Sequence, residues 1–349
     1  MEKKIILNVG TNFSLDQLKK YKELNEKYEK ATIGSVFGSL NTKELDIRSA
    51  RPDYRIGNTS FEEFEKYVQA ANDLSIEVEY TANATLYSSL SDIHNNLNKI
   101  VENFKILEKV GVKRLIVSNP LMMEIVSDYT NLKQKASTIM GISKPSAIKH
   151  YTKYNVDNIC TDIYSNRNIP LLADLQKEAE KHNAEIELLA NEVCFYGDTP
   201  CSNVLRSTCY QHSSLGGNAD KHFDNWPFSR CQRERENNPV CWLKIPYILP
   251  QHTQIYQEIT GISRFKISGR TNSWEYLSWI VEKYLSQSFT GDIHNLFMLP
   301  QNTTSLTNKN ITVEQLDKLS FFDKWIVDKK SCDYDCHHCG YCDKIYEKL

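Results

Sequence analysis

Nine of the ten cysteines fall in two segments of the chain, and four of these lie within residues 332–349. The four are spaced as C-x3-C-x2-C-x2-C, at Cys332, Cys336, Cys339 and Cys342. Thiolates are the ligands that soft metals select, and this spacing can bring four sulfur atoms to one ion or cluster. The C-terminal segment therefore predicts a metal site that holds a 4Fe-4S cluster or a zinc ion.

The second group lies in residues 192–250, a segment rich in Asn, Ser and Arg with little hydrophobic periodicity. Its cysteines are Cys194, Cys201, Cys209, Cys231 and Cys241. No secretory signal pattern opens the sequence, so we expect a cytoplasmic protein, in which clustered cysteines indicate metal or redox ligands rather than disulfides. The tenth cysteine, Cys160, lies in the apolar stretch VDNICTDIY and is expected in the core.

Net charge and hydropathy limit the kinds of partner that we expect the protein to bind. The chain has 42 Lys and Arg against 44 Asp and Glu, so it offers no broad electrostatic attraction to nucleic acid. No segment approaches the roughly 18–20 apolar residues of a membrane span. We expect a soluble protein that acts on a small molecule or a peptide rather than on RNA, with the oligomeric state left open.

Short β-rich segments alternate with amphipathic helical segments through most of the chain, the pattern of βα units around a parallel sheet. Eight strands are predicted, at residues 4–9, 32–37, 76–81, 113–118, 135–140, 156–161, 185–190 and 263–268. An eightfold repeat favours a TIM-type (β/α)8 barrel, whose functional groups follow the carboxyl ends of the strands.

Two helices and two interruptions complete this outline. A helix is predicted after the N-cap Ser60, and another should end at Gly111. The first interruption is the cysteine-rich insertion after strand seven, residues 192–250, which we expect to be a functional loop. The second is the tail, with a helix at 312–330 before the last cysteines. We predict a barrel domain over 1–290 that includes the insertion, and a metal-binding tail over 291–349.

Polar residues near the ends of the predicted strands are candidates for binding and catalysis. Arg270, at the end of the eighth strand, could clamp a carboxylate or phosphate, and Lys266 would alternate with it on the same face, although each could equally form a salt bridge within the barrel. Glu192 is a candidate acid or base. The candidates for hydrogen bonding a substrate are Asn119, Ser137, Thr138 and Asn191.

Three segments carry a family resemblance. They resemble the core of the collagenase-like peptidase family U32, and they are KASTIMGISKPSAIKHYTKYNVDNICTDI, AEIELLANEVCFYGDTPCS and SRFKISGR. The resemblance implies a barrel with a 4Fe-4S cluster, and several members act in oxygen-independent hydroxylation of ubiquinone precursors or RNA bases. It implies Cys194, Cys201 and Cys231 as ligands, with Cys241 as the fourth and Cys209 as its competitor.

The sequence leaves three further interpretations open. Cys332, Cys336 and Cys339 have the C-x3-C-x2-C spacing of radical S-adenosylmethionine enzymes, but the motif follows the barrel and Cys342 would close the site. A zinc-stapled binding or scaffold protein is the second alternative. The third is a peptidase, which we do not favour because H-E-x-x-H and G-x-S-x-G are both absent.

We therefore expect an iron-sulfur-dependent oxidoreductase, an oxygen-independent hydroxylase of a small or medium organic substrate. The insertion would hold the catalytic cluster and Arg270 would anchor an anionic group. The tail centre, a second 4Fe-4S cluster or zinc, would relay electrons from an electron-donor protein.

Overall fold

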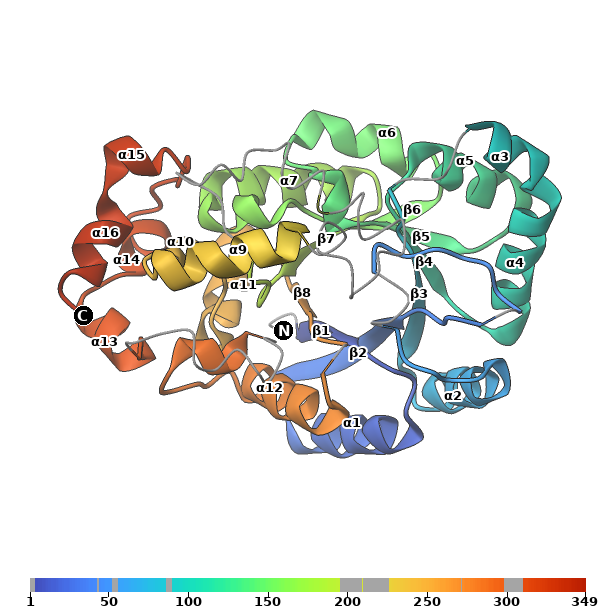
Figure 1. Cartoon of the computed structure of the whole chain (residues 1–349), viewed down its shortest axis with the longest axis horizontal. Helices are drawn as coiled ribbons and strands as arrows, with labels where there is room; N and C mark the ends of the chain where they lie inside the picture. The colour runs from blue at the N-terminus through green and yellow to red at the C-terminus, as the bar shows by residue number, and fades with distance from the viewer. Residues whose placement is uncertain are drawn as a thin grey trace.

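Eight parallel strands form a closed barrel in the order in which they occur in the chain (Figure 1). The computed structural model describes residues 4–42, 44–51, 56–85, 90–194, 209, 226–270, 272–297 and 310–349. The strands are β1 Ile5–Gly10, β2 Ala31–Gly38, β3 Glu77–Ala82, β4 Arg114–Val117, β5 Lys133–Ala136, β6 Val156–Cys160, β7 Glu185–Leu189 and β8 Arg264–Ile267. Because β8 also pairs with β1, the predicted TIM-type barrel is confirmed.

The strands match the sequence prediction except at the fifth, which was placed too late. Residues 135–140 were expected to be extended, but β5 ends at Ala136 and a 3-10 turn follows at Thr138–Met140. Ser137 causes the difference, since its hydroxyl accepts the Ile139 N–H and caps the turn. Residues that favour strands thus form a turn here because the side chain competes for the backbone.

Helices cover the outside of the barrel, and the two boundaries predicted from capping residues are confirmed. Ser60 forms a capping box with Glu63, and Gly111 ends its helix with φ of 100°. The helices of the barrel are α1 Leu15–Lys27, α2 Phe61–Asp73, α3 Leu90–Asn95, α4 Leu97–Val110, α5 Pro120–Tyr129, α6 Ile148–Thr152, α7 Ile169–Lys181, α11 Thr253–Thr260 and α12 Trp274–Ser286. In the described residues, no helix is both long and apolar enough to cross a membrane.

The insertion and the tail contain helices that the sequence did not predict correctly. In the insertion, α9 spans Trp226–Asn237 and α10 spans Cys241–Lys244. Helix α9 was missed because i,i+4 pairs such as Arg230–Glu234 (2.8 Å) support it instead of an apolar stripe. The single helix expected at 312–330 is wrong, because Ser320 (φ 52°) separates two short helices. The tail helices are α13 Val313–Lys318, α14 Asp323–Ile326, α15 Cys336–Cys339 and α16 Tyr341–Tyr346.

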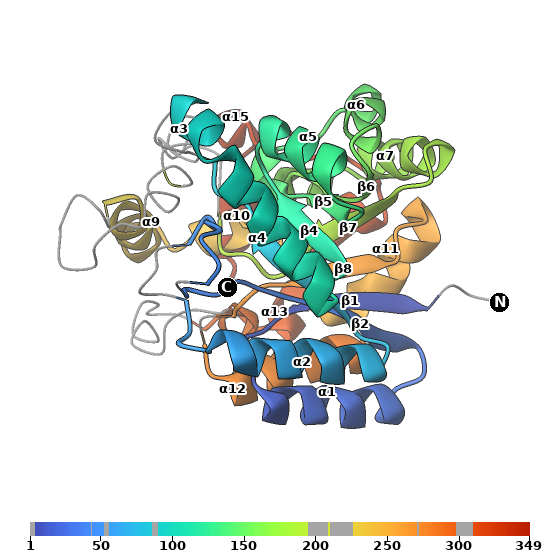
Figure 2. The same cartoon turned by 90° about the vertical axis from the view of Figure 1, so that its right-hand side faces the viewer.

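A second hydrophobic core joins the insertion to the tail. It contains the fully buried Trp242 and Leu243 of α10 together with Phe297, Phe321 and Trp325. Helix α10 contacts both α9 and α16, and these elements gather at one side of the barrel (Figure 1). Figure 2 shows α9 beyond the carboxyl ends of the strands. The domain boundary at residue 290 stays a prediction, and this core includes residues from both sides of it.

The barrel interior holds a buried ion network. Lys135 of β5 is fully buried and its ammonium lies 2.8 Å from Glu79 of β3 and 2.6 Å from Glu187 of β7. Asn8 of β1 donates to the same two carboxylates, at 2.7 and 3.1 Å. Arg114 of β4 adds a second cation 3.1 Å from Glu79. Burial opposes the charged form of Glu79, but Lys135 and Arg114 outweigh it and lower the pKa to about 2.

Replacing Lys135 by Met should lower the free energy of unfolding by about 3–5 kcal/mol, because two carboxylates would remain buried without their shared counterion. Urea denaturation measures the change. The matched control is Lys66→Met, which removes a lysine from an exposed pair with Glu62 and should leave the midpoint unchanged. Equal midpoints for Lys135→Met and wild type would contradict the structural role of the network.

Stability should also fall as the pH drops from about 4.5 toward 2. The folded-state pKa of Glu79 lies below its ordinary value of 4.5, so its contribution is complete above pH 4.5 and is lost as the carboxylate takes up a proton. Urea denaturation at a series of pH values measures the slope. The Glu79→Gln variant should have a shallower slope over this window, and parallel slopes would contradict the assignment.

Candidate functional site

Lys266 of β8 faces the inside of the barrel near its carboxyl end. The side chain is buried, and the ammonium lies 3.9 Å from the ring centroid of Phe37 on β2. Burial lowers the pKa of Lys266, and the charge of Glu187 acts in the opposite direction. No carboxylate of the described residues lies within ion-pair distance of this ammonium. Its position suits contact with a polar or anionic group that enters the barrel mouth.

Arg270 lies beyond β8 rather than at its end. The strand stops at Ile267, and Gly269 (φ 127°) turns the chain, so Arg270 does not alternate with Lys266 on one strand face as expected. The Arg270 Nη2 donates to Ser49 Oγ at 3.4 Å, while Nη1 is buried without a hydrogen-bond partner. Burial lowers the pKa of Arg270 to about 9, and the neighbouring charge of Arg51 adds to this effect. The guanidinium thus has N–H donors that remain available to a ligand.

The four predicted hydrogen-bonding residues make contacts within the protein. Asn119 caps α5, and Thr138 Oγ1 donates to the Thr161 carbonyl at 2.7 Å. Ser137 accepts from Asn83 Nδ2 at 3.3 Å. Asn191 is buried, and its amide donates to the carbonyls of Ser268 and Leu296 at 3.3 and 3.2 Å. These residues therefore organise the loops of the barrel mouth.

Three of the predicted ligands in the insertion lie around Arg235 of α9. Burial lowers the pKa of this guanidinium, while Cys231, Cys241 and Cys194, with Glu192, act in the opposite direction. Cys194 follows β7, and its Sγ lies 3.1 Å from the hydroxyl of Tyr164. The structure thus brings three thiols and a carboxylate to one buried cation at the carboxyl end of the barrel.

The remaining residues of that predicted site are Cys201, which lies outside the described residues, and Cys209, which is half-buried. Glu192 accepts the Val193 N–H through Oε1 at 3.0 Å, so one carboxylate oxygen is used locally. Cys160 is fully buried in β6, and burial raises the pKa of its thiol to about 12. Its location in the core is as expected.

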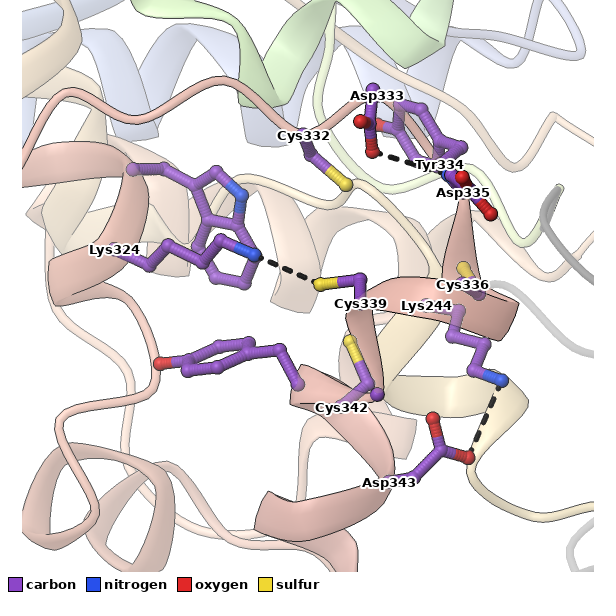
Figure 3. A pocket seen from close by; sticks show the side chains of 13 residues that line it. Lys244, Lys324, Cys332, Asp333, Tyr334, Asp335, Cys336, Cys339, Cys342 and Asp343 are labelled. Carbon is purple, nitrogen blue, oxygen red and sulfur yellow. Dashed lines mark hydrogen bonds and ion pairs between the residues drawn. The ribbon is translucent and has the colours of Figure 1, made fainter.

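The four C-terminal cysteines line one pocket. Cys332 precedes α15, Cys336 and Cys339 belong to α15, and Cys342 belongs to α16 (Figure 3). Burial raises the pKa of Cys342 to about 12, and Cys332 and Cys336 act in the same direction because they are close. Lys324 donates to Cys339 Sγ at 3.1 Å. These four residues line the same pocket, and their role as metal ligands stays a prediction.

The donor chemistry of both groups fits a soft metal. Within the part of the chain that the structure describes, no three His, Cys, Asp or Glu side chains are placed closely enough to hold an ion directly. The tail nevertheless offers four sulfur donors to one pocket, with Lys244 and Lys324 at its wall to balance negative thiolates. His338 is exposed and its Nδ1 lies 2.8 Å from Asp335, so sulfur dominates the donor set.

Comparison with known proteins identifies the family. The model for peptidase family U32 matches residues 19–290. The chain belongs to peptidase family U32. It is 22% identical over 298 residues to an uncharacterized protease of Methanocaldococcus jannaschii, a match that covers 83% of this chain and 82% of that protein. The resemblance drawn from the three sequence segments is thereby confirmed.

A solved structure of the U32 peptidase Mk0906 has the same fold. It aligns with a TM-score of 0.50 and 14% identity, over 77% of this chain and 94% of that one. At this identity the likeness concerns the barrel alone.

Sequence reasoning missed Arg167, the residue that connects this U32 barrel to its tail. Arg167 follows β6 and is buried, and its guanidinium donates to the carbonyls of Leu243 (2.9 Å) and Ile245 (2.6 Å). It lies 4.2 Å from the ring centroid of Trp325. Burial lowers the pKa of Arg167, but nearby groups, Cys342 first among them, raise it overall. The sequence signal that could have identified Arg167 was its position in a polar segment after a predicted strand.

Sequence reasoning also missed a carboxylate-imidazole pair in this U32 chain. Asp292 Oδ1 lies 2.5 Å from His294 Nδ1, and His294 Nε2 is buried without a hydrogen-bond partner. The ring stands edge-on to Trp242, with centroids 4.5 Å apart. The D-x-H spacing was visible, but nothing in the sequence placed it near the second core.

Replacing Arg167 by Gln should lower the free energy of unfolding by roughly 2–4 kcal/mol, because the Leu243 and Ile245 carbonyls would lose buried charged donors. Urea denaturation measures this effect. Arg233→Gln, at an exposed position of α9, is the matched control and should leave stability unchanged. Equal stability of the Arg167 variant and wild type would contradict the proposed link between barrel and tail.

Proposed function

We propose that this U32 protein is an iron-sulfur-dependent redox enzyme, an oxygen-independent hydroxylase of a small or medium organic substrate. The observation that carries the proposal is the gathering of Cys194, Cys231 and Cys241 around Arg235. This group follows β7 at the end of the barrel where enzymes of this fold place their active sites. Cys194 and Cys231 are half-buried there, whereas Cys241 is fully buried.

The residues around this site have different proposed roles. Cys194, Cys201, Cys231 and Cys241 would hold a 4Fe-4S cluster, which supplies one-electron chemistry when bound. Arg235 balances the negative charge of the thiolates, and Tyr164 is within hydrogen-bond distance of Cys194. Lys266 and Arg270 contribute positive charge at the mouth, and Glu192 is the candidate to hold or release a proton.

The tail would carry the auxiliary centre, a second 4Fe-4S cluster or a zinc ion. Its four sulfur donors lie around one pocket, and Cys339 is exposed. An exposed ligand suits electron exchange with a donor protein, whereas four closed thiolate ligands also suit a structural zinc. We propose that this centre relays electrons, and metal analysis distinguishes a 4Fe-4S cluster from a zinc ion.

Peptide hydrolysis is the second candidate function, because the family and its archaeal relative carry that name. The pair of Asp292 and His294 favours it, since a carboxylate that orients an imidazole is one part of many hydrolytic sites. A nucleophile beside His294 Nε2 would be required. Cys160 does not fill this role, because its buried thiol keeps its proton.

Anaerobic purification followed by iron, sulfide and zinc analysis tests the proposal. Two clusters predict about eight irons per chain with visible absorption, and one cluster predicts about four. Cys194→Ser should remove the barrel share and Cys336→Ser the tail share, while Cys160→Ser, a buried cysteine outside both groups, is the control. A colourless, iron-free protein after anaerobic handling would overturn the hydroxylase proposal, and peptide cleavage that Cys194→Ser leaves intact would favour the hydrolase.

A further inference from the structure

The mouth of the barrel has a second polar region, separate from the cysteines and centred on Arg270. One terminal nitrogen of its guanidinium, Nη1, is buried and makes no hydrogen bond. Nη2 has only a long contact, 3.4 Å, with Ser49 Oγ. A buried guanidinium is normally satisfied by several acceptors, so an incompletely bonded one indicates that a ligand supplies them.

The backbone near Arg270 is held closely against β1. A Cβ atom placed on Gly10 would lie 3.0 Å from both the Cβ and the backbone nitrogen of Arg270. Gly10 pairs with Phe37 of β2, whose ring lies under the Lys266 ammonium. The guanidinium is therefore carried by a backbone position with little freedom. Such preorganisation lowers the entropy cost of binding.

The segment that contributes Ser49 and Arg51 is anchored over the same mouth. The Ala50 N–H donates to Asn83 Oδ1 at 2.9 Å, and Asn83 in turn donates to Ser137 at 3.3 Å. These contacts tie the segment to the loops after β3 and β5. Ser49 and Arg51 thus flank the anchored Ala50, and the Ser49 hydroxyl is 3.4 Å from that of Ser39.

The charges in this region do not balance. Arg51 lies close enough to Arg270 for its charge to help lower the pKa of Arg270. Among the described residues, no carboxylate forms an ion pair with Arg270, Arg51 or Lys266. Two arginines near one another in a partly buried mouth repel each other, and an anion between them would remove that repulsion.

We propose that Arg270, Arg51 and Ser49 form an oxyanion-binding site for a small organic dianion, a dicarboxylate or a phosphate ester. The Arg270 fork contacts one oxyanion group, Ser49 donates to it, and Arg51 balances the second negative charge. Lys266 lies deeper and faces the far end of the ligand. This inference deepens the proposed function by naming the substrate class, and it rests on that function only for the reaction.

Calorimetric titration of the full chain with succinate and, separately, inorganic phosphate tests the site. At least one anion should bind, and succinamide, the neutral diamide analogue of succinate, should not. Arg270→Gln and Arg51→Gln should each weaken binding about tenfold or more, and Arg270→Lys should recover part of it because the charge remains but the fork is lost. Arg48→Gln, an exposed arginine of the same segment, is the matched control and should bind like wild type.

The outcomes separate the two ions and the two proposals. Tighter binding of succinate indicates a carboxylate ligand, and tighter binding of phosphate indicates a phosphate ester. Absence of binding by both anions, or equal binding by Arg270→Gln and wild type, overturns the site. If Arg270→Gln melts early, Ser49→Ala gives the same test with a smaller change. Titration does not depend on iron content, so failure of the hydroxylase proposal in metal analysis would leave this result standing.

Discussion

A lysine ammonium buried between two carboxylates is the constraint on which the barrel depends. Lys135, Glu79 and Glu187 come from β5, β3 and β7, and Asn8 adds β1 through hydrogen bonds to the same carboxylates. Buried charges are tolerated only when paired, so a shift of one strand along its neighbour would leave an ion uncompensated. The network therefore favours one register, and that register brings the carboxyl ends of the strands to one mouth.

The requirement that buried charges be paired also explains the positions of two arginines outside the barrel. Arg235 is buried near Cys194, Cys231 and Cys241, and Arg167 is buried near thiols of the tail. Burying a guanidinium costs free energy unless a nearby negative group interacts with its charge. Thiolate ligands in a low-dielectric environment are such negative groups. Each cysteine group thus has its own cation. Arg167 also connects the two regions, since its backbone carbonyl accepts the Cys332 N–H at 2.9 Å.

Sequence reasoning predicted the barrel correctly, because strand periodicity is a local signal, while the metal-binding role of the two cysteine groups stays a prediction. The ion network was not predicted. In EVE and EIE of β3 and β7, alternating charges indicate a solvent-facing side, whereas here Glu79 and Glu187 face the closed interior. Arg167 and Arg235 were missed for a different reason. Arg167 bonds to carbonyls more than seventy residues away, and α9, which carries Arg235, lacks the apolar stripe that marks a helix.

The barrel mouth is divided between groups of opposite chemical character. Arg270 and Ser49 follow β8 and β2, whereas Cys194 follows β7 and Cys231 lies on α9. An anionic group bound by Arg270 would leave the remainder of a substrate free to extend toward the thiols. Residues that select the substrate and residues that would hold the cofactor then belong to different elements. Asn191 connects them, because it bonds the end of β7 to Ser268 and so sets the distance between the two regions.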